Sequence, residues 1–233
     1  DTGLNLEKAF KIPHEAEEDI LGFIIEYNKK LEDWQIDIME IIRDEAYYFM
    51  PQIRTKIMNE GWACFWHYKI LHELNLDQSY HIPFLKSHNQ VVRPHVGRIN
   101  PYNIGFHLFN KINERHGLKE CFIAREVHND ESFLRQYLTR EDCEELNLFA
   151  YSPKGDATII DEVSDEDGWK PIKERLITQV GANSIPTIYA DSIEENHTLV
   201  LHHDHDGRDL DLNYAGKVCE HIVDLWGDDV KLF

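Results

Sequence analysis

The spacing of apolar residues changes near residue 148, and this change constrains the fold more than any other feature of the chain. Upstream, apolar residues return every three or four positions, as they do on the buried face of a helix. Downstream, short alternating runs are separated by residues typical of turns. The pattern predicts an α+β fold, with a mainly helical domain over residues 1–148 and a small α+β module over residues 149–233.

The first part is predicted to be a series of helices joined by short turns. Pro51 is placed at the start of a helix, because the first turn needs no amide donor. Residues 77–97 are rich in His, Pro and Asn, which predicts a long ordered connection without regular structure. The helices are expected near residues 20–31, 34–49, 51–74, 101–116, 132–138 and 141–148.

The second part is predicted to alternate strands and helices. Turn residues at 152–156 separate two short apolar runs, which indicates a hairpin over residues 148–163. The other expected elements are a helix over 169–180, strands over 185–190 and 198–203, a helix over 212–226 and a strand over 230–232.

Composition and charge narrow the class of protein. The 233 residues are 42% hydrophobic and 11% aromatic, which is typical of a globular chain rather than a disordered one. The net charge of -19 would repel a phosphate backbone, so we expect no nucleic acid and no anionic membrane surface as partners. An acidic surface could instead dock a basic protein or collect cations, or simply be solvated.

The cysteines and the start of the chain bear on its location. Four cysteines lie far apart, and no apolar stretch approaches the roughly 20 residues of a membrane span. No signal peptide is evident, so we expect a cytoplasmic protein with reduced thiols. The chain begins without an initiator methionine, which suggests a processed or excised segment.

Two polar residues interrupt an apolar stripe on the helix predicted over 51–74. The stripe steps by four and three residues, and Glu60 and His67 occupy it two turns apart, about 10 Å along the axis. The flanking residues are large and apolar, so we expect this helix to be buried and Glu60 to be neutralised, paired or metal-bound. The stripe consists of Ile53, Ile57, Glu60, Cys64, His67, Leu71 and Leu74.

A second acidic residue occupies a similar stripe on the preceding helix. Glu45 falls between Ile41 and Phe49, and it would face Glu60 and His67 if the two helices pair. Such a group would suit zinc or a di-metal centre, with Glu60 and His67 as ligands, or proton transfer by His67 and Glu45 as catalytic residues. The alternative is a buried Glu–His or Glu–Arg pair that fixes the register of the helices.

Several motifs spread over the chain resemble those of the stage V sporulation protein R (SpoVR) family, of which the chain is identified as a C-terminal portion. The strongest lies on the helix that carries Glu60. The matching segments are Asn59-Glu60-Gly61-Trp62-Ala63, Phe65-Trp66-His67, Gly97-Arg98-Ile99-Asn100-Pro101-Tyr102, Gly105-Phe106-His107, the run 125–133 and Leu225-Trp226-Gly227.

The resemblance implies a role in sporulation, in forming the spore cortex, or in stress and stationary-phase physiology. Its implied partners are a PrkA-type serine kinase and a von Willebrand A-domain protein. Two hypotheses follow. In the first, the protein is an enzyme. In the second, it is a non-catalytic adaptor whose acidic surface recruits such partners.

The resemblance also implies an incomplete metal site. Family members are longer and carry an upstream helix with two histidines spaced H-x-x-x-H, which this chain lacks. The Glu-Gly-Trp-Ala motif is similar to one in zinc peptidases, where the glutamate completes a site begun by two histidines. Glu60 would then be the third zinc ligand of a zincin-like hydrolase. His67 would be an additional ligand, a transition-state donor or a neighbour of the ligands. We expect this chain alone to bind no zinc and to be inactive.

Weaker signals mark other polar residues. Tyr102 and His107 lie about one turn apart and could line a cleft, although Asn100-Pro101 is first of all a helix start. Arg125, Glu126 and His128 form a secondary candidate, with Arg125 pairing with Glu60 or with a substrate carboxylate.

The cluster of His and Asp over residues 202–209 is explained as well by a strand that ends in an Asp-Gly turn as by a metal site. No nucleophile motif or phosphate-binding loop is present.

Overall fold

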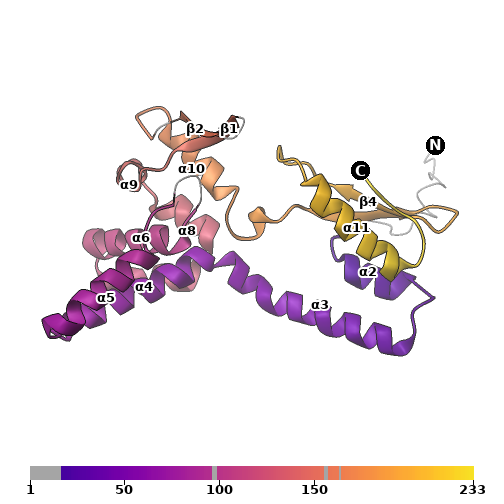
Figure 1. The fold of residues 1–233 in the computed structure, drawn as a ribbon, viewed down its shortest axis with the longest axis horizontal. Coiled ribbons are helices and arrows are strands. Elements are labelled where there is room, and N and C mark those ends of the chain that lie inside the picture. The colour runs from indigo at the N-terminus through magenta and orange to yellow at the C-terminus, as the bar shows by residue number, and fades with distance from the viewer. Residues whose placement is uncertain (1–16, 96–98, 155–156, 163) are drawn as a thin grey trace, which may run out of the picture. The chain divides into compact units, whose positions relative to one another are not determined.

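The computed structural model describes residues 17–95, 99–154, 157–162 and 164–233 (Figure 1). Within these residues, helices alternate with a two-stranded and a three-stranded sheet, which confirms the predicted α+β class. Two compact units form: one joins the residues up to Phe49 to Ile185–Phe233, and the other comprises Met50–Ser184. The boundary predicted at 148/149 falls inside the second unit, so it does not coincide with this grouping.

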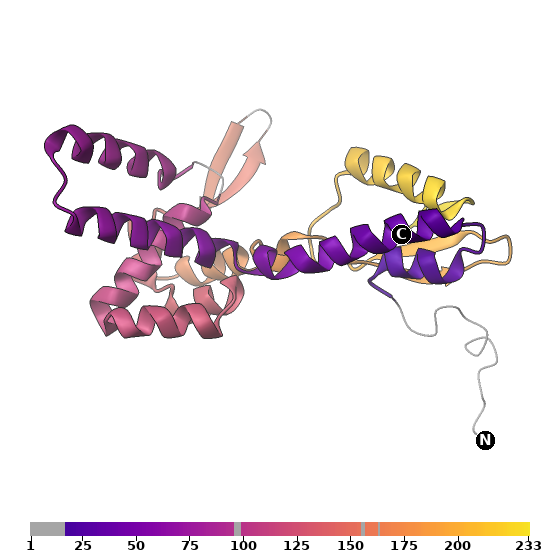
Figure 2. The ribbon, with the colours of Figure 1, turned by 90° about the horizontal axis from the view of Figure 1, so that it is seen from below.

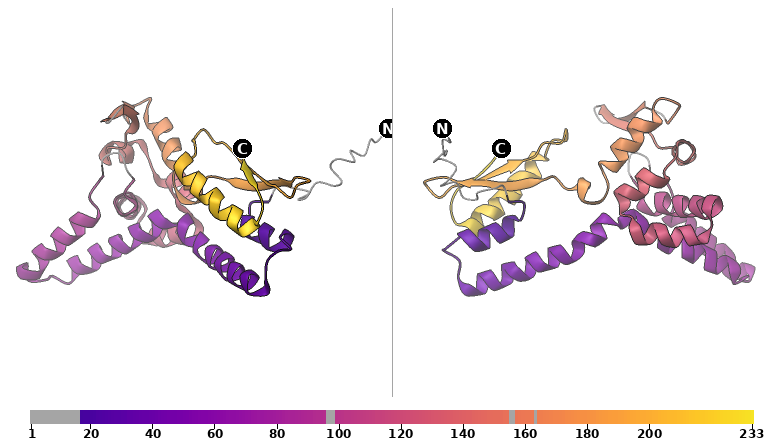
Figure 3. Two further views of the ribbon diagram at one scale, coloured as in Figure 1. Left: turned by 45° about the vertical axis from the view of Figure 1, so that its right-hand side comes forward. Right: turned by 180° about the vertical axis from the view of Figure 1, so that it is seen from behind.

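The first unit is built on a three-stranded sheet of order β3-β4-β5, with β3 (Ile188–Ile193), β4 (Leu199–His203) and β5 (Val230–Leu232). β3 and β4 are antiparallel, whereas β4 and β5 are parallel and need a crossover, which α11 (Leu212–Trp226) supplies. α11 and α2 (Ile20–Tyr27) pack against the sheet (Figure 3). The core residues are Phe23, Ile24, Met39, Ala190, Leu199, Leu201 and Trp226.

Trp226 is the largest buried side chain of this unit. Its ring stacks on His197 with a centroid distance of 4.7 Å, and its Nε1–H donates to the His197 carbonyl at 2.7 Å. The following Gly227 has φ 76°, a left-handed conformation that ends α11. Trp226 therefore ties the last helix to the loop between β3 and β4.

α3 (Asp33–Arg54) runs without interruption through Pro51, so the helix start predicted at Pro51 is wrong. Proline lacks the amide donor and its ring crowds the preceding turn, but Pro51 lies in the last turn of α3, and the helix continues to Arg54. The break comes at Thr55, whose φ of -129° lies outside the helical range. Met39 is the residue of α3 that is buried in the core of the first unit. Trp34, Ile38 and Ile41, which were predicted to form the buried face of this helix, are exposed.

The second unit is mainly helical, and α4 (Lys56–Glu73) and α6 (Pro101–His116) pack together at its centre (Figure 2). α7 (Leu118–Val127), α8 (Asp130–Tyr137), α9 (Arg140–Glu145) and α10 (Trp169–Ile177) pack around them, and the antiparallel hairpin of β1 (Ala150–Lys154) and β2 (Ala157–Glu162) precedes α10. The short helix η1 (Gly181–Ser184) closes the unit. Its core includes Phe65, Leu108, Phe109, Phe133, Leu134 and Leu138.

α5 (Gln78–Val91) occupies the segment that was expected to form an irregular connection, so that expectation is wrong. Its buried face consists of Phe84 and His88, with the ring of His81 one turn earlier. These residues recur at helical spacing, but two of the three are histidines. A search for apolar periodicity therefore does not detect the helix.

Candidate functional site around Glu60

A pair of glycines brings α4 and α6 into close contact. A Cβ atom on Gly61 would lie 2.3 Å from the Cα of Gly105, and one on Gly105 would lie 2.2 Å from the carbonyl oxygen of Ile57. Neither position has room for a side chain, so the two backbones touch directly. This contact fixes the residue before Gly61, which is Glu60, against the first turn of α6.

The N-terminus of α4 is capped by a residue distant in sequence. Thr55 makes no side-chain cap, and the carboxylate of Asp130 instead accepts hydrogen bonds from the amides of Ile57 at 2.8 Å and Met58 at 2.9 Å. A carboxylate at this place satisfies free amides and complements the helix dipole. Asp130 is fully buried, and this burial raises its pKa to about 6, although the backbone donors act in the opposite direction.

Glu60 receives two polar contacts near this capped end. The ammonium of Lys56, one turn earlier, lies 2.8 Å from Oε1. The pKa of Tyr102 on α6 is raised, first by a hydrogen bond to Glu60 and then by burial. The Glu60 side chain is 22% exposed, so the carboxylate is held in place and is still reachable from solvent.

Tyr102 owes its position to the start of α6. Asn100 caps the helix by accepting a hydrogen bond from the Tyr102 amide at 3.0 Å, and Pro101 occupies the first turn. The side-chain amide of Asn100 also donates to the carbonyl groups of Val91 and Arg93. The predicted helix start is therefore confirmed, and it also places Tyr102 beside Glu60.

The rest of the α4 stripe is only partly buried. Cys64 is buried, and this burial, with a smaller contribution from Glu60, raises the pKa of its thiol. His67 is exposed, and its ring contacts Phe84 and His88 of α5 at centroid distances of 5.3 and 6.2 Å. α4 is therefore not buried on all sides, whereas the sequence predicted that it would be. A role for His67 in metal binding or catalysis with Glu60 stays a prediction.

Glu45 lies on α3 in the first unit, with an exposed side chain. Its predicted catalytic role beside Glu60 stays a prediction.

His107 turns toward a different buried charge. Its Nε2 lies 3.1 Å from Oδ1 of Asp142, whose carboxylate also accepts two hydrogen bonds from Arg115 at 2.9 and 3.0 Å. Thr139 caps α9 against the same carboxylate. Burial alone would raise the pKa of Asp142, but the donors His107, Arg115 and Thr139 outweigh it and hold that pKa well below its usual range. His107 thus contacts the ion pair of Arg115 with the buried Asp142, and its predicted place in a cleft with Tyr102 stays a prediction.

The secondary candidates make mostly local contacts. The guanidinium of Arg125 lies 5.3 Å from the centroid of the Trp62 ring, so Arg125 contacts α4 by a cation–π interaction. Nδ1 of His128 lies 3.1 Å from the Ser132 hydroxyl, and Glu126 is exposed. These contacts help to dock α7 and α8. A part for these residues in binding stays a prediction.

Comparison with known proteins agrees with the motifs that converge on the Glu60 group. The family described as SpoVR like protein matches residues 2–185, and the SpoVR-like C-terminal domain matches residues 187–233. The chain belongs to the SpoVR family.

The alignment with a curated relative shows how much of a longer protein this chain spans. The uncharacterized protein YcgB of Escherichia coli (strain K12) is 29% identical over 259 residues, which cover 97% of this chain and 51% of YcgB. The chain thus spans about half the length of this relative. No solved structure matches it.

In this SpoVR-family chain, Glu60 and Tyr102 come from two of the family motifs. Of the two glycines that bring the helices together, Gly61 belongs to the motif of Glu60, and Gly105 belongs to a further motif, Gly105-Phe106-His107. Gly97 and Arg98 of the second motif lie outside the described residues. Sequence reasoning missed Asp130, because no local pattern reveals a cap supplied from a distant helix. It also missed Lys56, although a lysine four residues from a glutamate is a common pair on a helix.

The described residues do not form a complete zinc site of three or more protein ligands. Across residues 17–95, 99–154, 157–162 and 164–233, no group of three or more His, Cys, Asp or Glu side chains is arranged to hold a metal ion. At Glu60 the polar neighbours are an ammonium and a phenol, neither of which is a usual zinc ligand. Nor do the histidines near residue 203 form such a group: β4 ends at His203, and Gly207 turns the chain with φ 95°.

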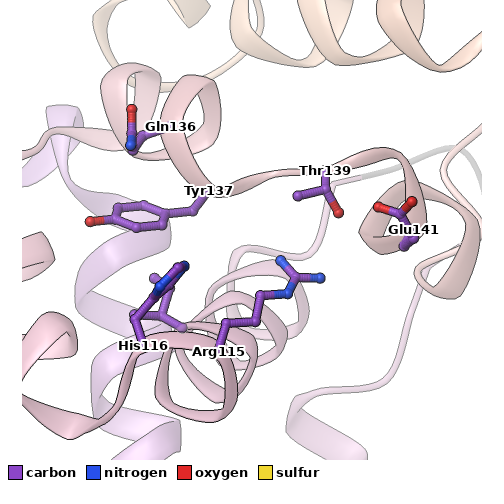
Figure 4. A pocket seen from close by; sticks show the side chains of 7 residues that line it. Arg115, His116, Gln136, Tyr137, Thr139 and Glu141 are labelled. Carbon is purple, nitrogen blue, oxygen red and sulfur yellow. The ribbon is translucent and has the colours of Figure 1, made fainter.

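A pocket of about 370 Å³ lies elsewhere in the second unit (Figure 4). Arg115 lines it, but its guanidinium is already paired with Asp142. The pocket shares no residue with the Glu60 group, and it is lined by Ile112, Arg115, His116, Gln136, Tyr137, Thr139 and Glu141. Among the described helices, none combines the length and the apolar character needed to cross a membrane.

Proposed function

We propose that this chain supplies the Glu60 group to a zincin-like hydrolytic site in a longer SpoVR-family protein. The observation that carries the proposal is the fixed, reachable carboxylate of Glu60, held by Lys56 and Tyr102 at a glycine contact between two helices. Its motif resembles the one in which a helical glutamate completes a zinc site. The further ligands belong to segments that this chain does not contain.

Each residue of the group has a structural reason to be there. Tyr102 lies close enough to Glu60 for the carboxylate to raise the pKa of the Tyr102 phenol, and Lys56 balances the charge of Glu60. Asp130 and the glycine pair fix the backbone that carries Glu60. Such positioning is what a metal ligand requires, because ligands are held by a surrounding layer of hydrogen bonds.

At the level of the cell, the proposal places the protein in sporulation, through the spore cortex, or in stress and stationary-phase physiology. The support is family membership and the name of the family. A deletion strain complemented with the Glu60→Gln gene tests whether the phenotype depends on this carboxylate.

The decisive experiment uses a full-length family member that contains this segment. We expect stoichiometric zinc by elemental analysis, and a loss of about tenfold or more in zinc affinity for Glu60→Gln. The matched control is Glu114→Gln, an exposed glutamate on α6, which should retain the metal.

One observation favours a second candidate, a non-catalytic adaptor. Lys56 already neutralises Glu60 without a metal. In that case Glu60→Gln leaves the zinc affinity of the longer protein unchanged and lowers only stability, and the protein co-purifies with a PrkA-type serine kinase or a von Willebrand A-domain protein. This combination of results would therefore replace the hydrolase proposal.

A further inference from the structure

Histidines line the interface between α4 and α5, the two antiparallel helices of a helical hairpin (Figure 2). α4 contributes His67 and His72, and α5 contributes His81 and His88. Phe84 lies among them, with ring centroids 5.3 to 6.0 Å from all four. Helical hairpins normally fill this interface with aliphatic side chains, so four imidazoles need a physical explanation.

The rings of His72 and His81 meet edge to face across the interface. Their centroids lie 5.3 Å apart, with an angle of 75° between the planes. Two imidazoles bound to one tetrahedral zinc ion have ring centres roughly 5 Å apart, because each Zn–N bond is about 2 Å long. Both side chains are half-buried, so an ion can reach them from solvent.

A backbone carbonyl already orients one of these rings. Nδ1 of His72 lies 3.0 Å from the carbonyl oxygen of Tyr68, one turn earlier on α4. A carbonyl only accepts, so Nδ1 carries the proton and the lone pair lies on Nε2. Histidine ligands of metal ions commonly show this arrangement, in which the other nitrogen donates to a carbonyl group.

His88, the most buried of the four histidines, leaves its hydrogen-bonding capacity unused. His88 is 2% exposed, and neither of its ring nitrogens has a hydrogen-bond partner among the described residues. Burying an imidazole without hydrogen-bond partners costs free energy, which weakens the packing of α5 on α4. A metal ion bound by both helices would offset part of this cost.

We propose that His72 and His81 bind a divalent transition-metal ion of the zinc class, which links α4 to α5. Imidazole nitrogens suit zinc, copper and nickel, and water fills the remaining positions around the ion. A pair of protein ligands is consistent with the finding that no group of three converges among the described residues. The site shares no residue with the Glu60 group and goes beyond the function proposed above.

The test is a titration of the metal-free chain with Zn²⁺ by calorimetry, and with Co²⁺ by its visible absorption. We expect one saturable ion per chain. His72→Ala and His81→Ala should each weaken binding about tenfold or more. His116→Ala, an exposed histidine on α6, is the matched control and should bind like the parent protein.

Hydrogen exchange separates binding at the hairpin from loss of the fold. Zn²⁺ should slow amide exchange in α5, and the metal-free alanine variants should keep the circular dichroism of the parent. The proposal is overturned if no saturable binding occurs, or if His67→Ala or His88→Ala abolishes binding while His72→Ala does not. Glu60→Gln should bind normally here, so failure of this test does not bear on the hydrolytic site.

Discussion

At the scale of single residues, the buried carboxylate of Asp142, which accepts hydrogen bonds from His107, Arg115 and Thr139, makes stability depend on pH. Its folded-state pKa lies below the usual range, whereas the unfolded value is about 3.9. Its contribution to stability is therefore fully present above about pH 4 and is lost as the pH falls further.

Asp142→Asn should lower the free energy of unfolding at pH 7 by about 3 kcal/mol, because Arg115 and His107 lose a buried partner. The variant should also lose less stability than the parent between pH 4 and pH 3. Urea unfolding at each pH measures both effects. Asp167→Asn, at an exposed aspartate, should leave the pH dependence unchanged, and an equal change in both variants would contradict the assignment.

The sequence could single out Glu60, because a carboxylate on an apolar stripe needs a partner, but it could not name that partner. Lys56 is one turn away and is a common surface pair, while Tyr102 reaches Glu60 only because two helices cross at glycines. His67 was expected on the same buried face, yet it lies over α5 instead. The packing of neighbouring helices decides such details, and periodicity does not encode it.

At the scale of elements, the contact between α4 and α6 depends on the absence of two side chains. Gly61→Ala should destabilise the protein by about 1–3 kcal/mol, because its Cβ meets backbone that cannot move aside. Gly216→Ala on α11 meets nothing within 4 Å and should stabilise by up to about 1 kcal/mol. Thermal unfolding of both variants measures this opposite response, and equal effects would show that the glycine contact is not tight.

Local chemistry predicted several elements well. α11 was expected over 212–226 and β5 over 230–232, and both form there. Strong amphipathic spacing and the stop at Gly227 explain this agreement. α5 was missed because histidines occupy its buried face, and the helix start at Pro51 was wrong because α3 tolerates proline.

At the scale of the molecule, the two units have separate hydrophobic cores. Trp226→Ala removes the largest buried ring of the first unit and should lower its free energy of unfolding by about 3–5 kcal/mol. Hydrogen exchange should show lost protection in residues 17–49 and 185–233 and little change in α4 or α6. Exchange that accelerates equally everywhere would contradict separate cores.

The grouping of the units follows from contacts that sequence patterns do not show. α2 and α11 lie at opposite ends of the chain, yet the side-chain amide of Asn28 donates to the Leu225 carbonyl at 2.9 Å. The boundary at 148/149 was predicted from a change in the spacing of apolar residues. That spacing indicates whether a segment is a helix or a strand, but it does not show which elements share a core, because a shared core depends on long-range packing.

The cap that Asp130 supplies to α4 also has a consequence for synthesis. The capping residue is separated from Ile57 by 73 positions, so the ribosome delivers the start of α4 long before the group that completes it. Until α8 has emerged and docked, the first amides of α4 can bond only to water. A nascent chain arrested before residue 130 should therefore show a frayed turn just ahead of Glu60, and the carboxylate gains its fixed place only when translation has passed α8.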